Sequence, residues 1–372
     1  MSRKILLLVS SMASGGAERV AANLVNAWSA RGDTVTLLIT FSGRGECFYP
    51  VSDNVKVIYL ADLAGCTGRN PSAYWARFWA LREFIRTSHS DAVVSFLSNV
   101  NIAAILACRR LGCRVIVSER IHPPKMSIGW ILPILRRLTY PTAFRVVMLS
   151  TEGLRWLETH IPRAKGVVIP NPVPYPLSVG DPILSIPPTV SPDRKLLLAI
   201  GRLDAQKGFA NLLESFGALA SRYFSWDLAI LGEGPERPRL VKQVAALGLQ
   251  QRVLLPGRAG NIGNWYERAD LYVMSSHFEG FPNTLAEAMA HGCAVASYDC
   301  DSGPRDIIRH ERDGLLVTPV GDVDAMTRAL ERLMGDDAER ERMASRAIEV
   351  RDRYSVARIL ELWDSLFDAE AG

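Results

Sequence analysis

The 372-residue sequence lacks the features that mark several large classes of protein. None of its six cysteines forms a C-x-x-C pair and no two histidines stand at zinc-ligand spacing, which argues against a zinc site. No window of about 18 residues is uninterruptedly apolar, so no segment is predicted to span a membrane. The apolar run near the N-terminus is too short for a signal peptide, and scattered cysteines fit a reducing compartment. We therefore expect a cytoplasmic protein.

The dinucleotide-binding glycine spacing is also missing. After the first apolar run the chain reads Ser14-Gly15-Gly16-Ala17-Glu18-Arg19, which is not G-x-G-x-x-G and argues against a dehydrogenase. Paired glycines at a helix start let a ligand approach the backbone, and the helix offers free N–H groups to an anion. The same pair also suits a simple tight connection, and both interpretations stay open.

What the sequence does contain is an alternation of apolar runs and helical patterns. Short Val/Ile/Leu runs are typical of strands buried on both faces, and their alternation with helices predicts a parallel sheet. In the first half we expect strands at 4–10, 34–40, 55–60, 92–97, 114–118, 145–150 and 166–170, with helices such as 17–31, 72–86 and 101–111. In the second half we expect strands at 195–200, 226–231, 252–256, 271–276, 294–298 and 314–318, then helices at 322–334, 338–351 and 356–367.

A proline-rich stretch separates the two series. Eight prolines fall between residues 170 and 192, a density that neither a helix nor a central strand tolerates. We interpret 173–193 as a linker between a first domain, 1–172, and a second, 194–354, with a last helix at 355–372 that crosses back to the first. The predicted fold class is α/β, with two doubly wound, Rossmann-like domains facing across a cleft.

Charge is divided unevenly between the halves. Residues 1–180 contain 21 Lys and Arg against 10 Asp and Glu, whereas residues 181–372 contain 22 against 29. A basic half suits a pyrophosphate or anionic lipid, although ordinary drift in surface charge gives the same pattern. Two basic, aromatic segments lie there, Tyr74–Arg86 and Ile128–Leu138, the second with Trp130, Arg136 and Arg137. They either contact an anionic membrane peripherally or pack as amphipathic helices on the sheet.

One loop in the second half combines cations with glycines. Gly201-Arg202-Leu203 and Lys207-Gly208 follow the first strand of that half. An Arg and a Lys at the carboxyl end of a strand can both reach one diphosphate, the Arg by a forked contact and the Lys as a point charge. The alternative is two solvated surface cations, but the flanking glycines favour phosphate.

A second segment places two carboxylates eight positions apart, in Glu279-Gly-Phe-Pro-Asn-Thr-Leu-Ala-Glu287. Carboxylates accept hydrogen bonds from the paired hydroxyls of a sugar or ribose. We expect Thr284 to cap a helix through Met289, with Glu287 one turn inside it and the first amides facing a phosphate. The carboxylate pair alone is weak evidence, and it gains specificity from the Arg202 and Lys207 loop.

Four segments together resemble the retaining glycosyltransferases of family 4. They are Gly15-Gly16-Ala-Glu-Arg, Gly201-Arg-Leu…Lys207-Gly, Gly232-Glu-Gly-Pro and Glu279-Gly-Phe-Pro-Asn…Glu287-Ala-Met-Ala, and the resemblance extends over essentially the whole chain. It implies the GT-B fold and a hexosyltransferase that moves a hexose or N-acetylhexosamine from a UDP-sugar with retention of configuration. Residues 256–306 are similar to the bacterial branch that builds polysaccharides and lipid-linked glycans, including N-acetylgalactosaminyl transferases. This implies a glycan or polyprenyl-diphosphate-linked acceptor at the inner face of the cell membrane, and no nucleic acid partner.

The resemblance also implies roles for individual residues. Arg202 and Lys207 would hold the donor diphosphate and stabilise the departing UDP, and Glu279 would hold the sugar hydroxyls near the reacting carbon. Glu287 would bind the ribose. Further substrate contacts are implied for Gly15, Gly16, Arg258, Gly280, Phe281, Pro282, Asn283 and Thr284.

One position departs from the family pattern. Many members carry a histidine after the fifth strand, close to the reacting carbon, where this chain reads Ser118-Glu119-Arg120-Ile121-His122. Arg120 stands at the aligned position and His122 lies two residues further on. Glu119, Arg120 and His122 are therefore candidate substrate contacts, and the sequence does not decide between Arg120 and His122.

The resemblance implies no protein nucleophile, with an oxygen of the leaving phosphate accepting the acceptor's proton. We identify no Asp-x-Asp metal motif in a loop of the predicted cleft, so we expect neither an essential metal nor a cofactor. Two other classes remain as alternatives, a UDP-N-acetylhexosamine epimerase and a non-catalytic nucleotide-sugar-binding protein. The combination of Arg202 and Lys207 with Glu279 and Glu287 disfavours the epimerase, and turnover separates an enzyme from a binding protein.

Overall fold

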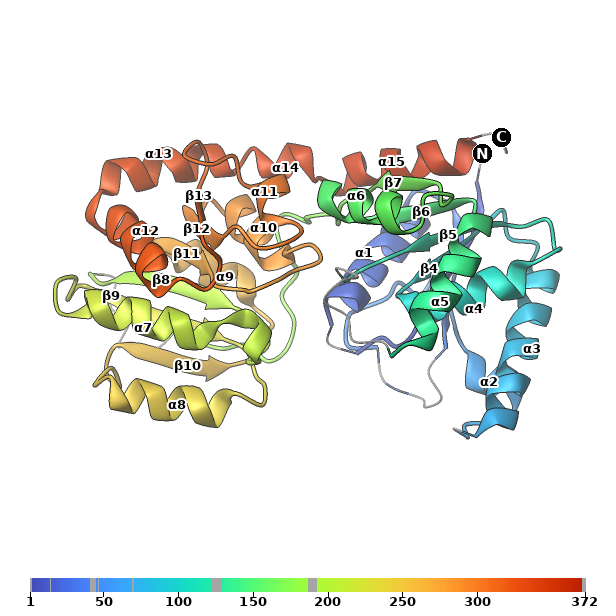
Figure 1. Cartoon of the computed structure of the whole chain (residues 1–372), viewed down its shortest axis with the longest axis horizontal. Coiled ribbons are helices and arrows are strands. Elements are labelled where there is room, and N and C mark those ends of the chain that lie inside the picture. Colours follow the sequence, from blue (N-terminus) through green and yellow to red (C-terminus); the bar gives the residue numbers. More distant parts are fainter. Residues whose placement is uncertain are drawn as a thin grey trace. The chain divides into compact units, whose positions relative to one another are not determined.

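The computed structural model describes residues 2–13, 15–40, 45, 47–68, 70–121, 129–186 and 193–369. It divides into two compact units, unit 1 with Met1–Pro172 and Val356–Gly372, and unit 2 with Val173–Ser355. Each unit has its own parallel sheet with helices packed against it (Figure 1). This is the doubly wound α/β architecture that the alternation of strands and helices predicts.

Unit 1 is built on a seven-stranded sheet with the order β3-β2-β1-β4-β5-β6-β7. Its strands are β1 (Lys4–Val9), β2 (Thr34–Ile39), β3 (Lys56–Tyr59), β4 (Ala92–Phe96), β5 (Arg114–Ser118), β6 (Arg145–Met148) and β7 (Gly166–Val168). Its helices are α1 (Gly16–Ala30), α2 (Leu60–Ala64), α3 (Pro71–Ser88), α4 (Ser98–Cys108), α5 (Ile131–Thr139), the 3-10 turn η2 (Tyr140–Thr142), α6 (Thr151–His160) and α15 (Val356–Asp368). The strand order reverses between β1 and β4, so the carboxyl ends of these two strands flank the topological switch point at which such sheets bind ligands.

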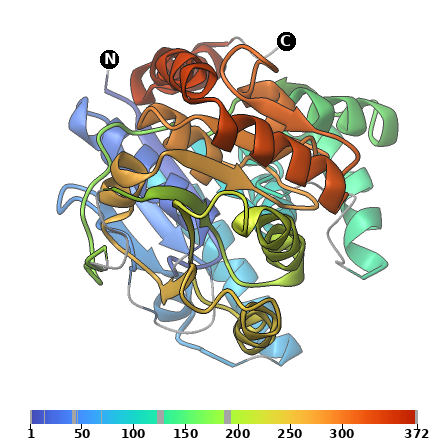
Figure 2. The ribbon, with the colours of Figure 1, turned by 90° about the vertical axis from the view of Figure 1, so that its left-hand side faces the viewer.

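Unit 2 has a six-stranded sheet with the order β10-β9-β8-β11-β12-β13, and Figure 2 turns this unit toward the viewer. The strands are β8 (Lys195–Ile200), β9 (Trp226–Leu231), β10 (Val253–Gly257), β11 (Leu271–Met274), β12 (Val295–Tyr298) and β13 (Leu315–Val317). The helices are η3 (Ala205–Lys207), α7 (Phe209–Ala220), α8 (Arg237–Ala246), α9 (Ile262–Arg268), α10 (Asn283–Ala290), α11 (Pro304–Ile307), α12 (Val323–Gly335), α13 (Asp337–Ala347) and α14 (Val350–Arg353). Here the order reverses between β8 and β11, which places a second switch point at the ends of those strands.

The sheets are held by strands that are apolar on both faces. All five residues of β4 and all six of β9 are buried, and β1 pairs in parallel with β2 on one side and β4 on the other. In unit 2 the side chains of Phe216, Trp226 and Met326 meet in one core between sheet and helices. Burial on both faces explains why these strands appear in the sequence as unbroken apolar runs.

The elements follow the sequence predictions closely, with three differences. Every expected strand is present, with ends within two residues of the expected ones. Helix α4 starts at Ser98, three residues before the expected 101, and the expected helix 338–351 is divided into α13 and α14. The stretch expected as a linker groups with unit 2, because the Val173 amide donates to the Tyr354 carbonyl at 2.8 Å and the Gly180 amide to the Gly260 carbonyl at 3.0 Å.

The last helix, α15, completes unit 1 from the far end of the chain. Trp363 packs edge-on against Trp28 of α1 with ring centroids 5.8 Å apart, and Phe367 lies at the same distance from Trp28. Both tryptophans are fully buried, so α15 provides part of the core of unit 1. No helix within the described ranges is long and apolar enough to cross a bilayer.

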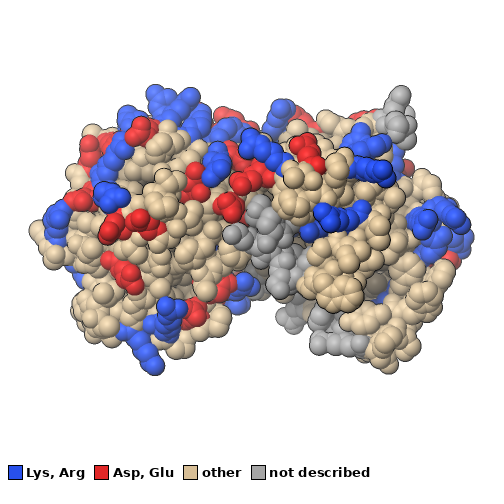
Figure 3. Space-filling view, viewed as in Figure 1, with Lys and Arg blue, Asp and Glu red and all other residues tan. Residues whose placement is uncertain are grey.

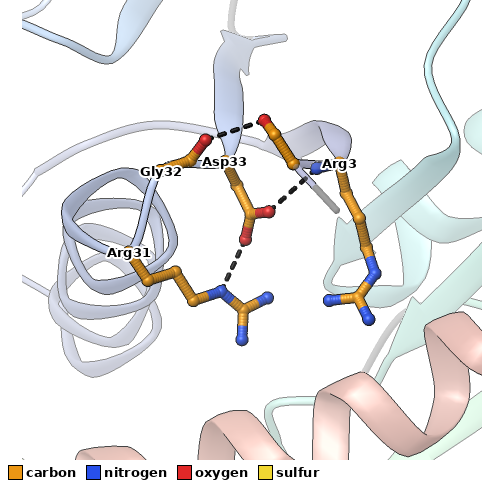
Figure 4. A pocket seen from close by; sticks show the side chains of 5 residues that line it. Arg3, Arg31, Gly32 and Asp33 are labelled. Atoms are coloured by element: carbon orange, nitrogen blue, oxygen red, sulfur yellow. Dashed lines mark hydrogen bonds and ion pairs between the residues drawn. The ribbon is translucent and has the colours of Figure 1, made fainter.

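Charged contacts fix the orientation of α15. Figure 4 shows the pocket lined by Arg3, Arg31 and Asp33, in which Asp33 accepts hydrogen bonds from the Arg31 side chain and the Arg3 amide. Both guanidinium groups also reach α15, because Arg3 Nη1 lies 2.8 Å and Arg31 Nη1 2.7 Å from the carboxylate of Asp364. Both guanidinium groups therefore form ion pairs within unit 1, and the residues of this pocket hold α15 in place.

Replacing Trp363 with alanine should destabilise unit 1 by about 3–5 kcal/mol, because it leaves a cavity beside Trp28. Urea unfolding of the full chain followed by circular dichroism measures this change. The matched control is Trp79→Ala, which removes an exposed tryptophan of the same unit and should change stability by about 0.5 kcal/mol or less. Equal effects of the two substitutions would contradict a structural role for α15.

Candidate functional site

The candidate donor site lies at the switch point of unit 2. The loop after β8 carries Arg202 and Lys207, and the loop after β11 carries Glu279 and leads into α10. Because β8 and β11 are neighbours in the sheet, both loops leave the same edge side by side. The two segments that the sequence analysis singled out, more than seventy positions apart in the chain, are thus brought together by the fold.

An ion pair joins these loops. Lys207 Nζ lies 2.6 Å from Glu279 Oε1, and both side chains are largely buried. Main-chain contacts reinforce the pair, since the Gln206 side chain donates to the Phe278 carbonyl at 2.8 Å and the Ser275 hydroxyl donates to the Lys207 carbonyl at 2.8 Å. Lys207 and Glu279 are therefore held in fixed positions by the protein itself.

Arg202 is held less tightly. Its side chain is 69% exposed and its Nε atom donates to Asp204 on the same loop. An exposed ion pair of this kind contributes little to stability. The guanidinium group is thus accessible to a ligand at the sheet edge.

Two glycines let the loops approach each other. Gly208 has a φ of +62°, and a Cβ atom built on it would lie 2.2 Å from the Ser275 carbonyl oxygen. Gly232 has a φ of +140°, and its Cβ atom would lie 1.9 Å from the Gly201 carbonyl oxygen. Any side chain at either position would push the Arg202 and Lys207 loop away from its neighbours.

Helix α10 places Glu287 inside the unit. Glu287 is buried, and the Tyr266 hydroxyl lies 3.3 Å from its Oε2 atom. The expected cap by Thr284 is wrong, because α10 starts at Asn283 with Pro282 at the cap position, and the Tyr272 hydroxyl donates to Thr284 Oγ1 at 2.8 Å. Burial raises the pKa of Tyr272 well above its usual range, so its hydroxyl keeps the proton that it donates.

The remaining residues predicted to contact the donor lie in the turn before α10 and in the loop after β10. Gly280, Phe281, Pro282 and Asn283 form the turn into α10, in which the Asn283 amide donates to the Phe281 carbonyl at 2.9 Å. Phe281 is buried with its ring 5.6 Å from that of Tyr354. Arg258 follows β10, two strands away from β8, and its residue is exposed. The structure therefore gathers the segment 279–287 with Lys207 and sets Arg258 further along the same edge.

Glu119 and Arg120, at the end of β5 in unit 1, are both buried. The Glu119 carboxylate accepts hydrogen bonds from Ser98 at 2.8 Å and from Tyr140 at 2.5 Å, and Arg136 Nη1 lies 3.7 Å from it. Burial and the nearby Glu119 charge raise the pKa of Tyr140 well above its usual range. All these contacts are internal to unit 1, so Glu119 shapes the ends of β4 and β5.

Arg120, the next residue, makes different contacts. Its guanidinium carbon is 3.6 Å from the centre of the Phe96 ring, and Nη1 donates to Asn171 Oδ1 at 2.6 Å. Burial lowers the pKa of Arg120 to about 9, and within the described residues Nε and Nη2 have no hydrogen-bond partner. His122 lies outside the described residues.

The glycine turn of unit 1 stands at its own switch point. Gly15 caps α1 and Gly16 is its first residue. Ser11 donates to Glu18 Oε1 at 3.0 Å, and a Cβ atom on Gly15 would lie 2.1 Å from Glu18 Oε2. The turn is therefore tight because Glu18 folds back over it.

The sequence analysis overlooked two Asp-x-Asp pairs, Asp299-Cys300-Asp301 in the loop after β12 and Asp322-Val323-Asp324 at the start of α12. The Asp299 carboxylate pairs with Arg305 at 2.9 Å, and the Asp301 carbonyl accepts a hydrogen bond from the Glu279 amide at 3.4 Å. In the part of the chain that the structure describes, no three His, Cys, Asp or Glu side chains are grouped as a metal site would need.

Four polar residues of the site were missed from the sequence: Gln206, Tyr266, Tyr272 and Ser275. A usable signal existed for the tyrosines, because a tyrosine within a buried apolar run needs a partner for its hydroxyl. Gln206 and Ser275 contact main-chain atoms of the neighbouring loop, and only the pairing of β8 with β11 brings those atoms near.

Comparisons with known proteins show the family and the fold of the chain. Residues 14–175 match the model of Glycosyltransferase Family 4 and residues 185–350 that of Glycosyl transferases group 1. The chain is 30% identical to a Campylobacter jejuni alpha-1,4-N-acetyl-D-galactosaminyltransferase named for a diNAcBac-PP-undecaprenol-linked substrate, over 97% of each protein. It is 29% identical over 95% of its length to an exopolysaccharide phosphotransferase of Streptomyces coelicolor, but spans only 39% of that protein.

Solved structures share the fold. Sucrose-phosphate synthase from Thermosynechococcus elongatus superposes with a TM-score of 0.82 at 18% identity, covering 99% of this chain and 100% of that one. Anabaena HepE, solved in complex with UDP and glucose, gives a TM-score of 0.77 at 18% identity, with 99% and 100% covered. Two family models match successive parts of the chain, a relative is 30% identical over 97% of each protein, and solved structures share the fold. The chain therefore belongs to the family 4 glycosyltransferases and has the GT-B fold.

Proposed function

We propose that the protein transfers a hexose or N-acetylhexosamine from a UDP-sugar to a glycan or polyprenyl-diphosphate-linked acceptor, with retention of configuration, in bacterial polysaccharide or glycan assembly. The single observation that carries the proposal is the juxtaposition of Lys207 with Glu279, 2.6 Å apart at the switch point of unit 2. A cation for the diphosphate lies beside a carboxylate for the sugar hydroxyls, and in a nucleotide sugar the diphosphate and the sugar are likewise adjacent. The undecaprenol-linked substrate in the Campylobacter relative's name supports the choice of acceptor.

The donor is recognised from both ends. Lys207 and Arg202 bind the diphosphate, Glu279 binds the sugar hydroxyls, and Glu287 accepts hydrogen bonds from the ribose. The turn 280–284 and the first amides of α10 lie along the phosphate and sugar, while Arg258 lies beside the base. Gly15, Gly16 and Arg120 of unit 1 bind the acceptor side.

Charge development determines what these residues do in the reaction. Breaking the bond between the anomeric carbon and the phosphate oxygen leaves negative charge on UDP and positive charge on the sugar. Fixed cations at the phosphate stabilise this separation, and each well-placed donor lowers the barrier by about 3–4 kcal/mol. The acceptor hydroxyl attacks the anomeric carbon, and its proton passes to an oxygen of the departing phosphate, so UDP and the new glycoside are the products.

Replacing Arg202 or Lys207 with alanine should lower turnover by roughly 10²–10³-fold each, because each removes a cation from the leaving phosphate. UDP release with lipid-linked acceptor and a panel of UDP-sugars measures the effect, and circular dichroism checks the fold. Arg239→Ala is the control, since Arg239 of unit 2 is exposed to the same degree, 68% against 69%, and lies on α8. Full activity in both Arg202→Ala and Lys207→Ala would refute the phosphate assignment.

Replacing Glu287 with glutamine should weaken UDP binding about tenfold, because a hydrogen bond to a buried charged group is lost. Isothermal titration with UDP and with inorganic diphosphate distinguishes the roles of the residues. Glu287→Gln should affect UDP alone, whereas Lys207→Ala should weaken both ligands. Tyr266→Phe is the control, since it removes the hydroxyl beside Glu287 and leaves the carboxylate. The ribose assignment fails if Glu287→Gln binds UDP as tightly as the unaltered protein.

A further inference from the structure

The turn between α4 and β5 brings two cysteines of unit 1 together. Cys108 is the last residue of α4, and Cys113 directly precedes β5. The Cys108 carbonyl oxygen accepts a hydrogen bond from the Leu111 amide at 3.0 Å and lies 3.8 Å from Cys113 Sγ. The two thiols also share a hydrogen bond, so their sulfur atoms are in contact in the reduced protein. We call Cys108 and Cys113 the turn thiols.

The backbone of this turn is held in a fixed shape. Arg110 has a φ of +62° and Gly112 a φ of +69°, and these two left-handed residues reverse the chain between the helix and the strand. Arg82 of α3 anchors the turn, because its Nη1 atom donates to the Ala107 carbonyl at 2.7 Å and to the Arg109 carbonyl at 2.9 Å. The contact between the turn thiols is therefore built into the fold of unit 1.

The turn thiols differ in their access to solvent. Cys108 is 5% exposed, whereas Cys113 is partly exposed. The residues between them face solvent at Arg109, Arg110 and Gly112. A small reagent can therefore reach the Cys113 sulfur, while the Cys108 sulfur is shielded behind the protein surface.

The surroundings favour a thiolate at Cys113. The hydrogen bond from the Cys108 thiol lowers the pKa of Cys113 to about 7, and the guanidinium group of Arg82 acts in the same direction. The same contact and burial raise the pKa of Cys108 well above its usual range. Residues 92–118 contain three arginines and no Asp or Glu, and Figure 3 shows that acidic side chains are sparser over unit 1 than over unit 2 on the face turned to the viewer. An accessible thiolate beside a second thiol is the arrangement that oxidants attack.

We propose that the turn thiols are a redox-modification site, which hydroperoxides oxidise to a disulfide between Cys108 and Cys113. The Cys113 thiolate attacks an oxygen of the hydroperoxide and the O–O bond breaks. The leaving alkoxide or hydroxide takes a proton from water, and Cys113 becomes a sulfenic acid. The Cys108 sulfur then attacks the Cys113 sulfur, and the Cys108 proton leaves with the sulfenic hydroxyl as water. The two cysteines lose two electrons, which the hydroperoxide takes up, and a small-molecule thiol reduces the bond again.

The other cysteines provide a control within the same chain. Cys66 is also partly exposed in unit 1, but its thiol lies 3.7 Å from the Ala73 carbonyl oxygen. Cys293 and Cys300 of unit 2 are buried, and burial raises the pKa of both thiols. Cys66 is therefore the matched control for Cys113. The proposal is independent of the proposed function, because neither turn thiol belongs to the donor site.

Treatment of the full chain with hydrogen peroxide, followed by tryptic digestion without reductant and mass spectrometry, tests the proposal. Trypsin cleaves after Arg109 and Arg110, so the disulfide should join two peptides that separate once the sample is reduced. Titration of free thiols should show that both turn thiols are lost, and dithiothreitol should restore them. In Cys108→Ala the oxidised Cys113 should persist as a sulfenic acid that dimedone traps.

Cys113→Ser should slow the oxidation of Cys108 roughly tenfold or more, because the accessible thiolate is lost. Cys66→Ser should form the disulfide as fast as the unaltered protein. The proposal is overturned if peroxide leaves the two peptides of the unaltered protein unlinked, or if Cys108 is oxidised equally fast in Cys113→Ser and Cys66→Ser. It is also overturned if a non-reducing gel shows Cys113 joined to a second copy of the chain, because Cys108 is then not its partner.

Discussion

The ion pair between Lys207 and Glu279 connects the two loops at the switch point of unit 2, and the arrangement of that edge depends on it. The pair forms because β8 and β11 are neighbours, and because Gly208 lets the backbones of the two loops approach within a distance that a side chain would prevent. Gly232, after β9, allows the same close approach to Gly201 on the other side of the β8 loop. Breaking a largely buried pair leaves one charge without its partner, which is costly. The protein therefore holds a cation and a carboxylate in place before any ligand arrives, and this preorganisation is what stabilises charge in a transition state.

The corresponding edge of unit 1 is organised differently. The Glu119 carboxylate is occupied by Ser98 and Tyr140, and the Arg120 guanidinium is buried against Phe96. The Glu119 oxygens have partners within the unit and the Arg120 side chain is buried, whereas Arg202 in unit 2 extends into solvent. The contrast supports the proposal that unit 2 recognises the charged nucleotide diphosphate.

Sequence reasoning recovered the strands because each is an unbroken apolar run, as Trp226–Leu231 illustrates with every residue buried. It also predicted that Arg202, Lys207, Glu279 and Glu287 act as one group, because their glycine and proline neighbours mark loops at strand ends. Of these four, the structure joins Lys207 and Glu279 directly. It wrongly predicted that Thr284 caps α10. The helix begins one residue earlier, with Pro282 at the cap position, and the Thr284 hydroxyl accepts a hydrogen bond from Tyr272. It could not foresee that Arg136 is buried and Arg137 exposed, because adjacent basic residues look alike until the packing of α5 on Trp156 is known.

The position of helix α15 in the chain affects the order in which the two units can fold during synthesis. Unit 2 is one continuous segment, Val173–Ser355, whereas unit 1 takes helix α15 from residues that follow unit 2 in the chain. Until those residues have been synthesised, Trp28 has no Trp363 to cover it, and the guanidinium groups of Arg3 and Arg31 have no Asp364. Unit 1 therefore cannot complete its core until all of unit 2 has been made, although most of its own residues are made first.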